Sequence, residues 1–111
     1  WTHNTTLSFR QKGTHGNMGS VVDTQESGAR RPVQAIDFGA WLRANTLNAQ
    51  LVVVKCDIEG SEYHVLPSLL ESGALCAVNY LLVEWHLDEV VGTAQRCRAQ
   101  TLRNTFEDTL R

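Results

Sequence analysis

Residues 51–62 read LVVVKCDIEGSE, and this stretch decides the fold. Its first part, Leu51–Cys56, is a nearly continuous apolar run that is rich in β-branched valine. Such a run is typical of a strand that is buried on both faces, as in a parallel sheet. The charged, glycine-containing part that follows, residues 57–62, predicts a strand-to-helix turn.

A second run of the same character, Tyr80–Trp85, predicts a second buried strand. Residues 61–72 between the two runs have apolar side chains at helical spacing. Those side chains are Val65, Leu66, Leu69 and Leu70. Pro67 lacks a backbone donor, so we expect it to split this helix, and Gly73 predicts the C-terminal stop. The strand–helix–strand order favours an α/β fold in which the two strands are parallel.

The residues before this unit predict one more strand and helix. Residues 33–36 have the composition of a short strand, and Asp37 can cap a helix over 37–46 through its side-chain oxygen. Phe38, Trp41 and Leu42 would share one face of that helix. We expect this strand–helix pair to extend the parallel sheet.

The length of 111 residues predicts one domain or part of one. Composition divides it into a hairpin and loop segment over 1–32, a βαβ core over 33–91 and a C-terminal helix over 92–111. The expected apolar face of that last helix is Ala94, Cys97, Leu102, Phe106 and Leu110.

Charge and cysteine content exclude several classes of protein. Ten basic and twelve acidic residues give a net charge of −2, which does not favour nucleic-acid binding. No apolar run reaches the 18 residues typical of a membrane span. The three cysteines lack zinc-site spacing, so we interpret Cys56 and Cys76 as small core residues. Their odd number favours a reducing compartment, with the cytoplasm slightly preferred.

Charged side chains follow both predicted buried strands. Asp57, Glu59 and Glu62 come after the first, and Glu84 and His86 end the second. Ligands of parallel sheets bind beyond the carboxyl ends of the strands, so this edge is the expected functional site.

Structural roles for the same residues stay open. Glu62 could complement the positive end of the following helix, and Asp57 could accept hydrogen bonds within the turn. Lys55 and Glu84 could form a buried ion pair between neighbouring strands. His86 could be a hydrogen-bonded structural histidine.

The stretch Lys55, Asp57, Glu59, Gly60 and Glu62, written K-x-D-x-E-G-x-E, resembles the signature of the FkbM-type methyltransferases. The segments Ala35–Leu42 and Leu82–His86, and the opening around Trp1, are also similar to that family, so the resemblance covers roughly residues 1–91. It implies a Rossmann-like class I methyltransferase sheet and S-adenosylmethionine as cofactor. It further implies methylation of a hydroxyl group on a sugar-like, polyol-like or other small acceptor.

One family feature is missing from the sequence. The family holds its cofactor in a glycine-rich turn after the first strand, whereas the cluster Gly13–Gly19 follows no convincing buried strand. We therefore expect a C-terminal fragment of the domain that lacks the N-terminal cofactor-binding half. No cofactor-binding residue is assigned within it, and the fragment alone is expected to be inactive and not to bind S-adenosylmethionine.

For the intact enzyme, the resemblance makes Asp57 the first candidate for the base or for orientation of the hydroxyl, with His86 the alternative. Glu59 is expected to hydrogen-bond the acceptor, and Gly60 to permit the tight turn. Lys55, Glu62 and Glu84 would support the site. A metal ion on Asp57, Glu59 and His86 fits by ligand type, but their spacing assigns none. Two alternatives remain, namely a carboxylate–histidine metal-dependent enzyme and a non-catalytic α/β interaction module.

Overall fold

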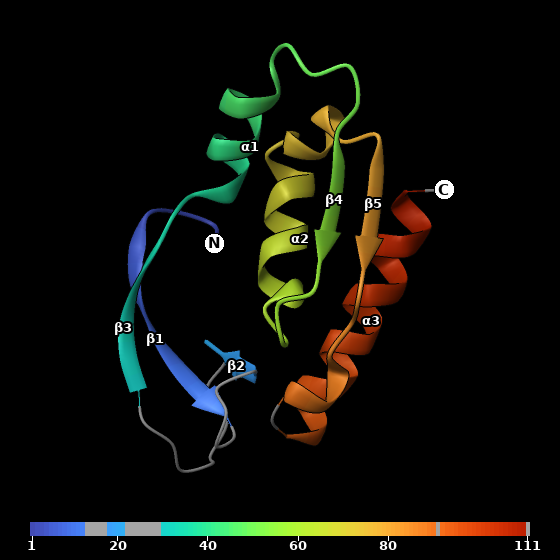
Figure 1. Ribbon diagram of the computed structural model, residues 1–111. Helices are drawn as coiled ribbons and strands as arrows, with labels where there is room; N and C mark the ends of the chain where they lie inside the picture. The colour runs from blue at the N-terminus through green and yellow to red at the C-terminus, as the bar shows by residue number, and fades with distance from the viewer. Residues whose placement is uncertain (13–17, 22–29, 91, 111) are drawn as a thin grey trace.

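The computed structural model describes residues 1–12, 18–21, 30–90 and 92–110. The glycines of the 13–19 cluster at positions 13 and 16 lie outside these residues. These residues form two small sheets and three α-helices, arranged as in Figure 1. In chain order the elements are β1 (Thr5–Lys12), β2 (Met18–Ser20), β3 (Arg30–Ala35), α1 (Phe38–Thr46), β4 (Val53–Cys56), α2 (Glu62–Glu71), the 3₁₀ helix η1 (Ala74–Ala77), β5 (Tyr80–Val83), the 3₁₀ helix η2 (Leu87–Glu89) and α3 (Thr93–Thr109).

The predicted parallel pair is confirmed. β4 and β5 pair in parallel, with Val53 opposite Tyr80 and Cys56 opposite Val83. α2 connects the two strands, and Figure 1 shows both arrows running the same way beside it. The carboxyl ends of β4 and β5 therefore lie at the same edge of the sheet.

β3 does not extend this parallel sheet, which corrects the sequence-based expectation. It pairs antiparallel with β1, and β1 also pairs antiparallel with β2, in a separate three-stranded sheet. β1 also begins only a few residues after Trp1, whose carbonyl accepts a hydrogen bond from Phe38 N at 2.9 Å. This hydrogen bond holds the residues just before β1 beside the start of α1. β1 therefore lies where β3, which directly precedes α1, can pair with it.

The expectation that both strands are buried on both faces is wrong. Val53, Tyr80 and Leu82 are 55%, 63% and 52% exposed, while the alternate positions pack against the core. α2 and α3 both contribute to the core on the side of Cys56, and the described residues place no helix on the opposite face. Composition shows that a run is apolar but does not show what covers it.

Two expectations about the helices before and between the strands have different outcomes. Asp37 caps α1 as predicted, because its side chain accepts a hydrogen bond from Ala40 N at 2.9 Å.

Pro67 does not split α2, which is continuous across it. Leu66 and Leu69, on either side of the proline, are 0% and 2% exposed. Burial of each leucine contributes about 1.5–3 kcal/mol, enough together to offset a proline penalty of about 3 kcal/mol.

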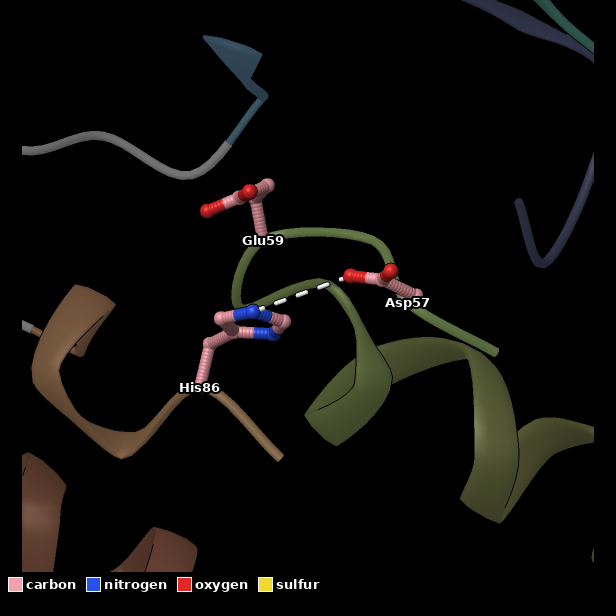
Figure 2. Close-up of side chains that lie close together, drawn as sticks. All are labelled: Asp57, Glu59 and His86. Carbon is pink, nitrogen blue, oxygen red and sulfur yellow. Dashed lines mark ion pairs between the residues drawn. The ribbon is translucent and has the colours of Figure 1, made fainter. Parts of the chain in front are cut away.

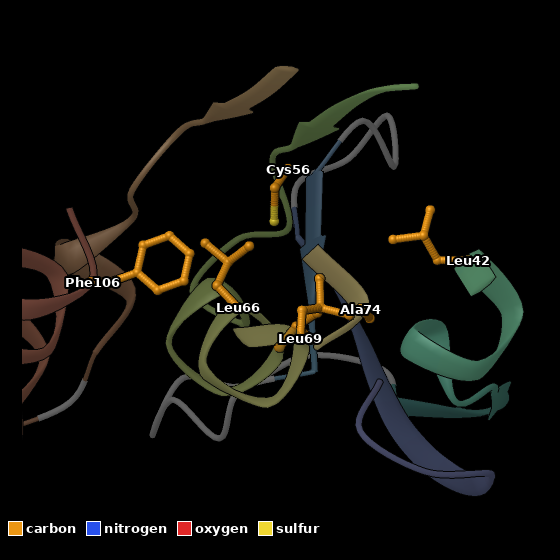
Figure 3. Close-up of a cluster of buried hydrophobic side chains, with 7 residues drawn as sticks. Leu42, Cys56, Leu66, Leu69, Ala74 and Phe106 are labelled. Atoms are coloured by element: carbon orange, nitrogen blue, oxygen red, sulfur yellow. The ribbon is translucent and has the colours of Figure 1, made fainter. Parts of the chain in front are cut away.

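The core joins all three helices and β4. Figure 3 shows side chains from α1, β4, α2, η1 and α3. The cluster consists of Leu42, Cys56, Val65, Leu66, Leu69, Ala74 and Phe106. Cys56 is buried as predicted, but Cys76 is exposed, because it lies on the outer side of η1.

α3 buries a narrower face than expected. Ala99 and Phe106, seven residues apart, are its buried residues, while Ala94 and Cys97 are exposed and Leu110 is half exposed. Residues seven apart lie on nearly the same side of an α-helix, so α3 packs only a narrow stripe of its side chains into the core. Among the described residues, no helix is both long and apolar enough to cross a membrane.

Candidate functional site

The polar residues predicted at the strand ends come together in the structure. Asp57 and Glu59 lie in the turn between β4 and α2, and His86 lies after β5. One ligand-type atom from each of the three lies within 4.8 Å of the other two. Figure 2 shows the His86 ring reaching toward the turn that carries the two carboxylates. We call these three residues the Asp57–Glu59–His86 cluster.

The turn itself has an unusual backbone. Glu59 has a φ of +52° and Gly60 a φ of +92°. Glycine adopts such values without steric cost, as the sequence predicted for Gly60. Glu59 is the one non-glycine residue with positive φ among those described, and this conformation costs roughly 1–2 kcal/mol. Strain of this kind is concentrated at functional sites.

Glu62 stabilises both the turn and the histidine. Its side chain is fully buried, with Oε1 accepting a hydrogen bond from Ile58 N at 2.7 Å and Oε2 one from Gly60 N at 2.9 Å. Nδ1 of His86 lies 3.0 Å from Oε1. A carboxylate can only accept hydrogen bonds, so Nδ1 of His86 carries the proton and donates a hydrogen bond to Oε1. Glu62 therefore does more than complement the positive end of α2, which was the structural role left open for it.

The second ring nitrogen of His86 faces the cluster. Nε2 lies 3.7 Å from Asp57 Oδ1 and 3.9 Å from Glu84 Oε1, both too long for hydrogen bonds. Burial lowers the pKa of His86. The hydrogen bond to Glu62 and the charges of Glu62, Glu59 and Asp57 outweigh this and raise the pKa above the ordinary 6.5.

Lys55 lies at the exposed rim of the same edge. Its Nζ is 2.5 Å from Asp57 Oδ2 and 3.8 Å from Glu84 Oε2. The Lys55–Glu84 pair is therefore present but not buried, since the side chains are 63% and 60% exposed on the open face of the sheet. The hydrogen bond from Lys55 lowers the pKa of Asp57, so Asp57 is ionised at neutral pH.

A pocket of about 360 Å³ lies between this turn and the antiparallel sheet. Its walls include Trp1, Leu7, Phe9 and Val65, and its polar lining is Asp57, Glu59 and Ser61. Ser61 is 4% exposed, and its Oγ has no hydrogen-bond partner among the described residues. His86 is not among the lining residues. A few convergent polar groups in an apolar pocket of this size are typical of small-molecule sites.

Sequence reasoning did not identify Ser61 or Trp1 as site residues. Ser61 could have been noticed as the residue directly before α2, but its side chain makes no capping hydrogen bond. Trp1 had no local signal, because its position depends on the hydrogen bond between its carbonyl and Phe38.

Comparisons of the chain with protein-family models, with curated proteins and with solved structures find no match.

Proposed function

We propose that this chain forms the acceptor side of an S-adenosylmethionine-dependent methyltransferase with a Rossmann-like sheet, which methylates a hydroxyl group of a sugar-like, polyol-like or other small molecule. The observation that carries the proposal is that Asp57 and Glu59 line a 360 Å³ pocket at the carboxyl edge of two parallel strands. Ligands of parallel sheets bind at this edge. The K-x-D-x-E-G-x-E sequence of residues 55–62 supports the reaction class by its resemblance to the FkbM-type enzymes.

The pocket suits an acceptor with an apolar body and one or more hydroxyl groups. Trp1 and Phe9 offer aromatic surface to the body, while Asp57, Glu59 and Ser61 offer oxygen atoms to the hydroxyls. Because Lys55 keeps Asp57 ionised, Asp57 is a hydrogen-bond acceptor that orients the attacking hydroxyl. Alignment of this kind is a large part of catalysis in displacement reactions.

The described residues do not fit the cofactor itself. Both turns that follow the parallel strands are carboxylate-rich, and neither is the glycine-rich helix start that binds nucleotide-type cofactors. S-adenosylmethionine is therefore assigned to none of the residues that the structure describes. The role of the chain is to bind and orient the acceptor.

The test is methyl transfer by the complete protein that contains these residues. The protein is incubated with S-adenosylmethionine carrying a labelled methyl group and a panel of sugars, polyols and hydroxylated aromatic compounds. We expect a labelled methyl ether from at least one of them. No labelled product from any acceptor would overturn the proposal. It would favour a non-catalytic interaction module, which the exposed Val53, Tyr80 and Leu82 support.

Asp57→Asn then tests the residue assignment, because it keeps the side-chain shape and removes the charge. Turnover should fall by about 10²-fold or more, while the melting temperature changes little. Glu71→Gln, an exposed carboxylate at the opposite end of α2, is the matched control and should leave turnover unchanged. A lowered melting temperature of Asp57→Asn with normal turnover would show that Asp57 only stabilises the turn.

A further inference from the structure

We propose that the Asp57–Glu59–His86 cluster is a binding site for a divalent metal ion. The three side chains come from two different segments, the β4–α2 turn and the residues after β5. Their ligand-type atoms all lie within 4.8 Å of one another. The spacing along the chain did not indicate such a site, because the grouping depends on the parallel pairing of β4 and β5.

The distance between His86 and Asp57 is one that two ligands of a single ion can have, and it is not that of a hydrogen bond. His86 Nε2 and Asp57 Oδ1 are 3.7 Å apart, too long for a hydrogen bond. Ligands about 2.1 Å from one ion are separated by about 3.0 Å when adjacent in an octahedron and about 4.2 Å when opposite. A pair of atoms 4.8 Å apart would have to approach by about 1.8 Å to become adjacent ligands, so closing the cluster around an ion needs movements of up to about 0.9 Å per side chain.

Glu62 prepares His86 to be a ligand. A histidine that binds metal through one nitrogen typically donates its other N–H to a carboxylate, which fixes the ring. Oε1 of Glu62 accepts a hydrogen bond from Nδ1 of His86, with 3.0 Å between the two atoms. Glu62 also accepts hydrogen bonds from two backbone N–H groups of the turn. When His86 is neutral, its Nε2 lone pair faces carboxylates, which also offer only lone pairs. A cation between them resolves this unfavourable arrangement.

Ser61 gives an independent indication that a ligand belongs beside the cluster. Its buried Oγ has no hydrogen-bond partner among the described residues, although it lines the pocket together with Asp57 and Glu59. An unsatisfied buried hydroxyl costs about 1–3 kcal/mol, which a bound ligand would remove. Asp57 and Glu59 thus belong both to the cluster and to the lining of the pocket.

Two carboxylates with one imidazole suit Mn²⁺ and similar divalent ions, because carboxylates favour hard cations and imidazole favours the first-row transition metals. Lys55 opposes binding, since its ammonium already neutralises Asp57 through Oδ2. Oδ1 of Asp57 is the oxygen that faces His86. If the function proposed above is correct, the ion would bind the acceptor hydroxyl and make it more acidic.

The test is Mn²⁺ binding to the complete protein, measured by electron paramagnetic resonance of free Mn²⁺. Glu59→Gln and His86→Asn should weaken Mn²⁺ binding by at least about 10-fold. Even the loss of a residue that only hydrogen-bonds a metal ligand typically costs that much affinity. His86→Asn keeps a donor for Glu62 and removes Nε2. Lys55→Met should tighten binding, and Glu71→Gln should leave it unchanged. Equal affinity in Glu59→Gln, His86→Asn and the unsubstituted protein would overturn the site.

A second measurement does not depend on any variant folding. Mn²⁺ added to the unsubstituted protein should broaden the ring resonances of His86 before those of His64, whose ring lies tilted beside that of Trp1. Broadening that does not begin at His86 would contradict the site.

Failure of the metal site and failure of the proposed function can be told apart. Methyl transfer that persists in a chelator, without Mn²⁺ binding, would reject the ion alone. Mn²⁺ binding at His86 without methyl transfer to any acceptor would reject the proposed function alone.

Discussion

His86 Nδ1 lies 3.0 Å from Oε1 of Glu62, a carboxylate without exposed surface. This contact joins the first residue of α2 to the segment after β5, 24 residues further along the chain. Glu62 also accepts hydrogen bonds from the backbone N–H groups of Ile58 and Gly60. The same carboxylate therefore holds both the backbone of the turn and the ring of His86. The contact therefore determines the geometry of the candidate site.

Glu62→Gln should destabilise the protein. The glutamine keeps one oxygen, but its NH₂ group would face a backbone N–H that can only donate. Leaving a buried donor unsatisfied costs about 1–3 kcal/mol, so the free energy of unfolding should fall by that amount in urea titrations. Glu71→Gln is the exposed control, with an expected change within about 0.5 kcal/mol. Equal stability of the two variants would contradict the role given to Glu62.

His86 should titrate above 6.5 in the metal-free protein, as followed by its ring resonances in an NMR titration. Glu62→Gln should lower this pKa, because the hydrogen bond and the charge are lost while burial remains. Since the folded-state pKa is the higher one, the stabilising contribution of His86 is complete below about pH 6.5. It is lost as the pH rises through the folded-state pKa. The stability difference between the unsubstituted protein and His86→Asn should shrink over that interval; a difference that grows with pH would be inconsistent with this sign.

Glu59→Gly should separate stability from function. Glycine removes a cost of roughly 1–2 kcal/mol at φ +52° and loses about 0.5–1 kcal/mol through the entropy of the unfolded chain. On these backbone contributions alone, stability should stay equal or rise by about 1 kcal/mol, while Mn²⁺ affinity and turnover fall. Gly60→Ala, at φ +92°, is the opposite case and should lower stability. A marked loss of stability in Glu59→Gly would show that the glutamate side chain is held for structural reasons.

Cys56 should resist thiol reagents. It is 6% exposed, and burial, with smaller contributions from the charges of Glu62 and Asp57, raises its pKa to about 11. Cys76 and Cys97 are exposed. At pH 8, iodoacetamide should modify two cysteines rapidly and the third only after unfolding in guanidinium, as read by mass spectrometry. Rapid modification of Cys56 in the folded protein would show that the core around β4 opens.

The sequence predicted that the charged side chains meet at one edge, because this follows from strand direction alone. Two apolar runs joined by a helical segment indicate parallel strands, and parallel strands bring their carboxyl ends to one edge. The convergence of Asp57 and His86 could therefore be expected from the sequence alone. The cap at Asp37 and the stop at Gly73, which has a φ of +69°, were predictable because both depend on local hydrogen bonds.

Other features could not be predicted, because they depend on which parts of the chain meet. The exposure of Val53 and Leu82 depends on which face α2 and α3 cover. The continuity of α2 at Pro67 depends on the burial of Leu66 and Leu69, which a local penalty does not include.

By itself, then, the sequence determined the parallel pair, the strand-to-helix turn and the identity of the charged residues at its edge, since periodicity and turn chemistry are local properties. Tertiary structure alone decided that β3 pairs with β1, that Glu62 is buried beneath the turn, and that Ser61 and Trp1 line a pocket with Asp57. The physical reason is that burial and side-chain partners are set by contacts between distant segments. Those contacts give Glu62 the His86 ring as a partner instead of solvent.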